Sequence, residues 1–322
     1  MQPSLFTNHL FRASSGGHIL TYQEKVSAKE LSEISILKSE RDTGLNANGN
    51  KVKWTDTKKE KYIKLTSKRD APDILPTGVI THLDDVFRSV FDGRKRYLKN
   101  KYLDKGNICE QDSMQLASDI DGEFYEPHEK YYENDFICGT PDIVFEDVKD
   151  IKSNYDKDSF DKAELTTLYT WQVRFYLWLC GFTKGELVYC LVNGTIDDLN
   201  NQKYYLKNAL GDLDGTSEEY KKQVQQLERN MIFDIEAWKK NYPFYEFENT
   251  ELNFSISKIR RIKRFDIELL PEHITFIKKR VKMCREYLIE KEKTELEILK
   301  NYSIADYNSK IEYINYKLKQ IA

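Results

Sequence analysis

Apolar runs and apolar residues at helical spacing alternate along this chain of 322 residues. The segments 136–145 and 148–153 are short apolar runs separated by a two-residue polar turn, which predicts a β-hairpin. Helical spacing over 163–180 predicts a helix, and the apolar run 185–193 is typical of a buried strand. The order strand, strand, helix, strand predicts a mixed α/β core.

Helical patterns also flank this core on both sides. Apolar residues at helical spacing predict helices over 26–37, 83–91, 97–103, 107–117, 218–241 and 273–300. The stretch 51–75 is Lys-rich and aperiodic, so we expect a long loop there, and the tail after Leu299 fits either a final helix or a frayed end. We expect a helical and loop extension over 1–76, a core over 77–212 and a helical, basic region over 213–322 packed on the core.

Composition places the chain among globular proteins. Hydrophobic residues make up 40% and charged residues 32%, and the length is sufficient for a sizeable core. Five cysteines without C-x-x-C spacing indicate neither a zinc knuckle nor an iron–sulfur cluster and fit a reducing cytosol. We find no basic leader with an apolar run and no apolar stretch of bilayer length, so we expect a cytoplasmic protein without membrane contact.

The net charge of −3 conceals two basic segments. Residues 94–105 carry six basic side chains and one acid, and this run is either a solvated helix face or a phosphate contact. Residues 258–285 carry ten basic side chains against three acids, which predicts a polyanion-binding surface. The candidate contacts in the second segment are Arg260, Arg261, Lys263, Arg264, Lys279 and Arg280.

Three charged residues of the hairpin are the strongest candidates for chemistry. Asp150 and Lys152 are two residues apart, so on an extended strand they project from one face, and Asp142 on the neighbouring strand can lie opposite them. Two carboxylates and an ammonium suit phosphodiester hydrolysis, in which carboxylates hold Mg²⁺, the metal activates water and a cation stabilises developing charge. A solvated ion pair at a sheet edge is the structural alternative.

Residues on either side of the hairpin extend this candidate site. Glu110, near the start of the amphipathic helix over 107–117, is either a surface residue or a third carboxylate for a site that binds two cations. Gln172 and Tyr176 are four residues apart and share one helix face. They either satisfy each other's hydrogen bonds or orient the metal site.

Four motifs in this order resemble the PD-(D/E)XK nuclease superfamily. The motifs are Gly139-Thr-Pro-Asp142, Asp150-Ile-Lys152, Trp171-Gln172-Val-Arg-Phe-Tyr176-Leu-Trp-Leu-Cys-Gly181 and Leu187-Val-Tyr-Cys-Leu-Val192. They are similar to the phage and RecB-like exonuclease branch, which includes the lambda-type and YqaJ-type recombination exonucleases. The resemblance implies a restriction-endonuclease-like α/β (α+β) fold, with a mixed central sheet flanked by helices and with helical N- and C-terminal additions. Specific motifs are confined to 106–193.

The resemblance also implies roles for individual residues. Asp142 and Asp150 would ligate Mg²⁺, for which Mn²⁺ would substitute, with the Ile151 carbonyl as a further ligand. Lys152 would position or activate the attacking water, and Glu110 would complete the cation site.

Gln172 and Tyr176 match a Gln-x-x-x-Tyr element of the exonuclease branch, where it supports the active site and the DNA end. No iron–sulfur cluster is expected, because the flanking cysteines that hold one in related nucleases are missing from this sequence.

By this resemblance the chain is a Mg²⁺-dependent DNA exonuclease that acts on linear, double-stranded ends in phage-type recombination or DNA processing. A single-strand annealing protein and a second copy of the chain are candidate partners, and the location would be the host cytoplasm if a phage encodes the protein. The alternatives are a structure-specific or restriction-type endonuclease and a non-catalytic DNA-binding protein that retains the fold.

Overall fold

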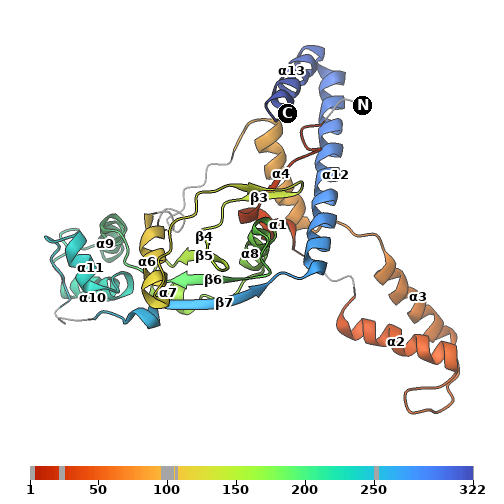
Figure 1. The fold of residues 1–322 in the computed structure, drawn as a ribbon, viewed down its shortest axis with the longest axis horizontal. Helices are drawn as coiled ribbons and strands as arrows, with labels where there is room; N and C mark the ends of the chain where they lie inside the picture. Colours follow the sequence, from red (N-terminus) through yellow and green to blue (C-terminus); the bar gives the residue numbers. More distant parts are fainter. Residues whose placement is uncertain (1–3, 22–25, 96–104, 106–107, 250–253, 322) are drawn as a thin grey trace. The chain divides into compact units, whose positions relative to one another are not determined.

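A computed structural model describes residues 4–21, 26–95, 105, 108–249 and 254–321 (Figure 1). It contains two compact units, one formed by residues 21–82 and the other by residues 1–20 together with 83–322. These limits differ from the boundaries at 76 and 212 that we expected from the sequence. The helix predicted over 97–103 lies outside the described residues and stays a prediction.

The larger unit is built on a four-stranded mixed sheet with the order β4-β5-β6-β7. The strands are β4 (Ile143–Val144), β5 (Val148–Ser153), β6 (Lys184–Cys190) and β7 (Ile262–Glu268). β5 pairs antiparallel with β4, as the hairpin pattern predicts, and parallel with β6, while β7 is antiparallel to β6. The sheet therefore includes a strand from beyond the 77–212 range.

A second, three-stranded sheet divides the first predicted strand. β3 (Ile137–Gly139) pairs parallel with β1 (Phe11–Arg12) and antiparallel with β2 (Tyr132–Glu133). The single strand that we expected over 136–145 is thus wrong, because β3 and β4 belong to different sheets. Pro141 lies between them and lacks the N–H group that a continuous ladder would need.

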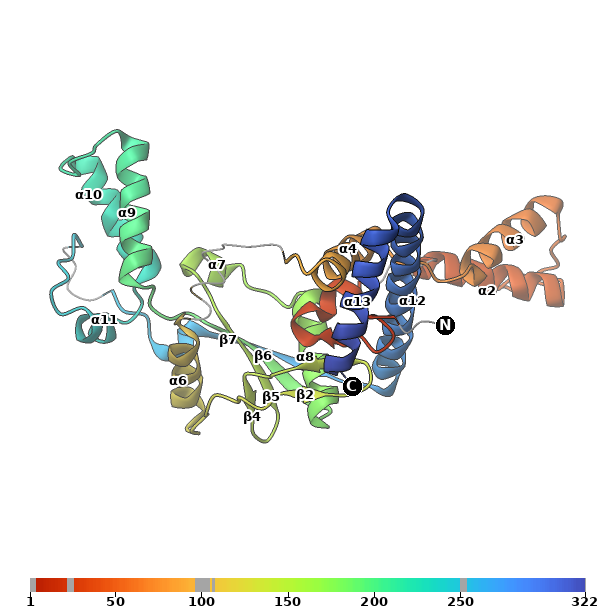
Figure 2. The same ribbon diagram turned by 90° about the horizontal axis from the view of Figure 1, so that it is seen from above.

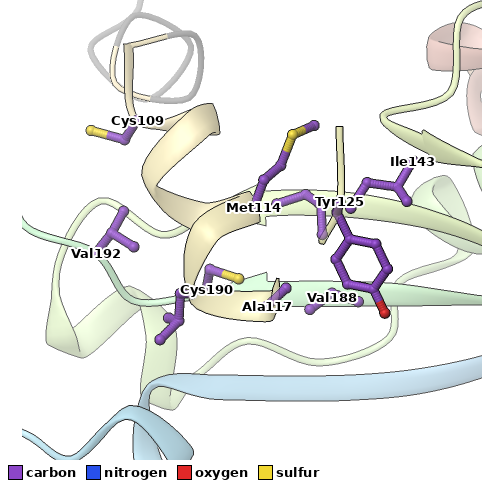
Figure 3. Packing of buried hydrophobic residues seen from close by; sticks show 10 residues of the cluster. Cys109, Met114, Ala117, Tyr125, Ile143, Val188, Cys190 and Val192 are labelled. Atoms are coloured by element: carbon purple, nitrogen blue, oxygen red, sulfur yellow. The ribbon is translucent and has the colours of Figure 1, made fainter. Parts of the chain in front are cut away.

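Helices α6 (Glu110–Asp121) and α8 (Thr167–Cys180) pack on the four-stranded sheet. Met114 and Ala117 of α6 lie in one buried cluster with Ile151 of β5 and Val188 of β6 (Figure 3). Because strand side chains alternate, Asp150 points to the other face, where it contacts α8. The helix predicted over 163–180 thus begins at Thr167, with Thr166 as its N-cap.

Between β6 and β7, the described residues form the helices α9 (Ile196–Leu210), α10 (Glu218–Met231) and α11 (Ile235–Asn241). Helices α9 and α10 lie side by side (Figure 2). Trp238 of α11 is buried in the core of this insertion. The helix expected over 218–241 is interrupted after Met231, where Ile232 is extended, and Asp234 then caps α11 by accepting a hydrogen bond from the Ala237 N–H.

The remaining elements of the larger unit are short N-terminal turns and long helices. They are η1 (Ala13–Ser15), α1 (Gly16–Ile19), the second part of α4 (Thr77–Phe91), α7 (Lys157–Asp161), η2 (Lys258–Arg261), α12 (Pro271–Tyr302) and α13 (Ile304–Ile321). The tail after Leu299 is therefore helical through most of its length. Strand β7 was not predicted, because its apolar residues Ile262, Phe265 and Ile267 are not evenly spaced and lie in a segment dominated by charged residues.

The smaller unit contains the helix pair α2 (Ala28–Thr43) and α3 (Asp56–Asp70). Its core consists of Ile34, Leu37 and Leu65, against which Trp54 and Tyr62 pack. Ion pairs join the two helices, for example between Lys58 and Glu40 at 2.7 Å. The long loop that we expected over 51–75 is wrong, because contacts with α2 stabilise a helix whose own apolar periodicity is weak.

The contact between α1 and α8 gives a test of packing. A Cβ atom on Gly17 would lie 2.3 Å from the Leu168 Cα atom, so Gly17→Ala forces the backbones apart. We expect urea denaturation to show a loss of about 1–3 kcal/mol in the free energy of unfolding. As the control, Gly78→Ala in the first turn of α4 meets nothing within 4 Å and should stabilise slightly. Equal effects of the two substitutions would contradict this packing.

Candidate active site

The carboxylate of Asp150 is the centre of the candidate site. Asp150 lies within β5 and is 0% exposed. Its Oδ1 atom accepts a hydrogen bond of 3.0 Å from Gln172 Nε2 on α8. Its Oδ2 atom lies 2.7 Å from Lys152 Nζ in an ion pair, yet within the described part of the chain it accepts no hydrogen bond of ordinary geometry.

Asp142 reaches the same place from the residue before β4. Its Oδ2 atom accepts a hydrogen bond of 2.7 Å from the Ile151 N–H and lies 3.9 Å from Lys152 Nζ. The Lys152 ammonium also donates to the Ile151 carbonyl at 3.3 Å. The structure therefore brings together the two carboxylates, the ammonium and the carbonyl that the sequence analysis grouped.

Gln172 and Tyr176 form the wall of this site on α8. Gln172 Nε2 donates to the Tyr176 hydroxyl at 3.4 Å as well as to Asp150. A Cβ atom on Gly139 would lie 2.9 Å from Tyr176 Cε1 and 3.0 Å from the Ala13 Cβ atom. Only glycine lets β3 approach the Tyr176 ring and the η1 turn this closely.

Glu110 approaches the site from the opposite face of the sheet, at the first turn of α6. Burial raises the pKa of its carboxyl group, the charge of Asp142 raises it further and Lys152 lowers it, so these charged groups lie within electrostatic range. The start of α6 is anchored to β5, because Ser153 Oγ is 2.7 Å from Ser113 Oγ.

The charges of the buried pair depend on each other. Burial raises the pKa of Asp150 to about 7, with Lys152 opposing this shift and Asp142 adding to it. Burial alone would lower the pKa of Lys152, but the carboxylates of Asp150 and Asp142 raise it above its ordinary value. Lys152 thus stays protonated, and a further positive charge near Asp150 would favour its ionised form.

These residues fit a divalent cation with oxygen ligands. Asp142 and Asp150 supply hard carboxylate oxygens, which Mg²⁺ and Mn²⁺ prefer, and Mg²⁺ commonly uses one or two carboxylates together with water and phosphate. The buried Asp150 Oδ2 atom contacts the Lys152 ammonium at 2.7 Å and makes no other polar contact in the described residues that would keep it from ligating a cation. In the described residues, no three His, Cys, Asp or Glu side chains form a ready-made metal cage, so Glu110 is not joined to the two aspartates in one.

Tyr169 is a neighbour of the site that the sequence analysis missed. Its ring centroid is 5.5 Å from Lys152 Nζ. Tyr169 precedes Gln172 by three residues and Tyr176 by seven, so helical spacing alone places all three on one face of α8. That spacing was the signal in the sequence.

The basic residues predicted to contact DNA have different surroundings. Arg261 is 5% exposed and donates to Asp234 at 3.2 Å, and Arg280 is also buried. Lys263 donates to the Phe160 carbonyl at 2.7 Å at the end of α7.

Arg264 bridges Asp121 at 2.6 Å and Glu186 at 2.7 Å. By contrast, Arg260 and Lys279 are exposed. Much of the positive charge counted over 258–285 therefore neutralises or caps protein groups, and the predicted DNA contact rests on the exposed pair.

Lys105 belongs to the first basic run and is 1% exposed. Its Nζ atom donates to the carbonyls of Tyr155 at 2.8 Å and Val192 at 3.1 Å, beyond the ends of β5 and β6. Lys105 is thus neither a solvated residue nor a phosphate contact, and it ties the segment before α6 to the sheet. Arg96, Lys99 and Lys101 of the same run lie outside the described residues.

Comparisons with known proteins support the fold. No family model and no curated protein match the sequence. Among solved structures, the chain is similar to a phage-related exonuclease from Haemophilus somnus 129PT, with a TM-score of 0.54 and 17% identity over 89% of this chain and 97% of that one.

An alkaline exonuclease (LHK-Exo) from Laribacter hongkongensis is similar at a TM-score of 0.40 and 10% identity, over 78% of this chain and 90% of that one. The structure of LHK-Exo in complex with dAMP is similar at a TM-score of 0.37 and 11% identity, over 77% of this chain and 88% of that one. The first of these likenesses, together with the mixed sheet flanked by helices, confirms the expected α/β fold.

Lys105 generates a prediction about pH. Burial lowers its pKa to about 8 from 10.5, so between these values the folded protein binds fewer protons than the unfolded chain. The stability of the wild type relative to Lys105→Met should therefore rise with pH across this window, by about 3 kcal/mol. Denaturation of both proteins at several pH values measures this, and a constant difference would contradict a buried, charged Lys105.

Proposed function

We propose that this protein is a metal-dependent deoxyribonuclease that acts as an exonuclease on linear DNA. The observation that carries the proposal is the convergence of Asp142, Asp150 and Lys152 at one spot, with ion-pair distances of 2.7 and 3.9 Å. The motifs that resemble the exonuclease branch lie at this spot. The fold shared with a phage-related exonuclease is consistent with the same activity.

Asp142 and Asp150 would hold the cation, Mg²⁺ or Mn²⁺, with the Ile151 carbonyl as a further ligand and Glu110 contributing to a second cation. When bound, such a cation supplies a water of lowered pKa and stabilises negative charge on the phosphate and the leaving 3′ oxygen. Gln172 fixes the orientation of the Asp150 carboxylate through its 3.0 Å hydrogen bond.

Lys152 would act on the attacking water. Its ammonium is held beside both carboxylates and would orient that water and stabilise the charge that develops on the phosphate oxygens. Tyr176, linked to Gln172 at 3.4 Å, would support the DNA end. These proposed roles use groups that lie on or next to the sheet, on α8 and, for Glu110, at the start of α6.

The biological setting follows from the resemblance. We propose double-stranded ends as the substrate and phage-type recombination or DNA processing as the pathway, with a single-strand annealing protein and a second copy of the chain as candidate partners. A location in the cytoplasm, or in the host cytoplasm for a phage protein, belongs to the same proposal. Within the described residues, none of the helices has the length and apolar character needed to cross a bilayer.

Two substitutions test the chemistry. Asp150→Asn removes a ligand charge, and Lys152→Arg places a bulkier guanidinium where a compact ammonium is needed, so both should retain the fold and lose activity on end-labelled linear DNA by on the order of 10²–10³-fold. Asp147→Asn and Lys157→Arg are matched controls on the same hairpin and on α7, and should stay near wild-type rates. Unchanged activity of the Asp150 variant would refute the assignment.

Covalently closed circular DNA separates the alternatives in the same assay. An exonuclease leaves circles intact, whereas cutting of circles would indicate a structure-specific or restriction-type endonuclease. Binding to DNA ends in EDTA, with no nucleotide release in Mg²⁺ or Mn²⁺, would indicate a non-catalytic DNA-binding protein.

The exposed basic residues give a second test, on binding. If Arg260 and Lys279 each neutralise a phosphate, Arg260→Ala and Lys279→Ala should each reduce the slope of log K against log[salt] by roughly 1. Lys222→Ala, on an exposed part of α10, is the control and should leave the slope unchanged. Titration of labelled duplex DNA in EDTA at several salt concentrations measures these slopes. Identical slopes for all four proteins would exclude the predicted contact.

A further inference from the structure

The ammonium of Lys152 has two kinds of neighbour. The first kind is the carboxylates of Asp150, at 2.7 Å, and Asp142, at 3.9 Å. The second kind is the aromatic ring of Tyr169, whose centroid lies 5.5 Å from Nζ. The face of a Tyr ring carries negative charge, and a cation within about 6 Å of the ring centroid is attracted to it.

The two carboxylates cannot bind the Lys152 ammonium as strongly once they also ligate a divalent cation. Asp150 is fully buried, and its Oδ2 atom lies 2.7 Å from the Lys152 ammonium, so in this structure that oxygen serves Lys152. A cation held by Asp142 and Asp150 would draw on this oxygen and repel the ammonium. Lys152 then needs another source of negative charge close by, and moving only a short distance toward Tyr169 provides one.

The Tyr169 ring is held in place by other aromatic residues. It makes an edge-to-face contact with Tyr189 of β6, with centroids 6.1 Å apart and an interplanar angle of 80°. Tyr189 in turn donates a hydrogen bond of 3.1 Å to the Glu164 carbonyl and packs edge to face against Phe265 of β7. The ring beside Lys152 therefore packs on β6 through Tyr189, which is itself held by Phe265 of β7 and by its hydrogen bond to Glu164.

We propose that Tyr169 is a positioning residue. Its ring would attract the Lys152 ammonium in place of the carboxylates when a divalent cation occupies Asp142 and Asp150. Tyr169 thereby keeps the ammonium next to the attacking water, although the carboxylates no longer hold it. This inference rests on the proposed function, because it presupposes a cation at the two aspartates. It assigns the effect to the ring and not to the Tyr169 hydroxyl.

The test measures Mn²⁺ affinity by calorimetry on the full-length protein, without DNA. Tyr169→Leu removes the ring and should weaken Mn²⁺ binding by about three- to thirty-fold, because the displaced ammonium loses its partner. Tyr169→Phe keeps the ring and should bind Mn²⁺ like the wild type. Tyr205→Leu, at an exposed tyrosine on α9, is the matched control and should also leave the affinity unchanged.

The Lys152→Met background shows whether the ring acts through Lys152. In that background Tyr169→Leu should have no effect on Mn²⁺ affinity, because the ammonium has been removed. Tyr169→Met replaces Tyr169→Leu as the ring-free variant if the leucine substitution unfolds the protein, which circular dichroism reports.

Three results would overturn the inference while leaving the proposed function intact. They are wild-type affinity in the ring-free variant, an equal loss of affinity in Tyr169→Phe, and a loss that persists in the Lys152→Met background. If the wild-type protein binds no Mn²⁺, the proposed metal-dependent function fails and the role of Tyr169 fails with it.

Discussion

The burial of the Asp150 carboxylate within the sheet is the constraint on which the site depends. A buried charge is costly unless it is paired and hydrogen-bonded, and here Lys152 supplies the opposite charge and Gln172 the hydrogen bond. Each partner has to be placed by a different element. Lys152 follows on the same strand. Gln172 can donate to Asp150 only if α8 packs on this face of the sheet with Gln172 directly over Asp150.

That requirement accounts for much of the surrounding architecture. The opposite face of β5 is filled by α6 through Met114 and Ala117, which fixes the strand from behind (Figure 3). Close packing at Gly139 brings β3 against Tyr176, and the N–H of Ile151 orients Asp142. The backbone and apolar contacts therefore hold two carboxylates, Asp142 and Asp150, beside the single ammonium of Lys152, and such an excess of negative charge is typical of sites that bind a cation.

The sequence was sufficient for the parts of this arrangement that local spacing determines. The alternation in 148–153 placed Asp150 and Lys152 on one face of a strand. The four-residue interval placed Gln172 and Tyr176 on one face of a helix. Strand β7 could not be recognised, because the two adjacent basic residues Lys263 and Arg264 break the period of two, and only the tertiary structure shows that Arg264 pairs with Glu186 across the sheet. Local charge counting failed for a related reason, since Arg261 and Lys105 are buried and bind protein groups that only the tertiary structure brings near.

The central claim is that Asp142 and Asp150 form a divalent cation site. Its most direct test is a crystal structure of the protein grown with Mn²⁺, with diffraction data collected to detect the anomalous signal of manganese. We expect an anomalous peak in contact with carboxylate oxygens of both aspartates. A well-ordered site with no such peak, or with manganese bound only elsewhere on the protein, would contradict it.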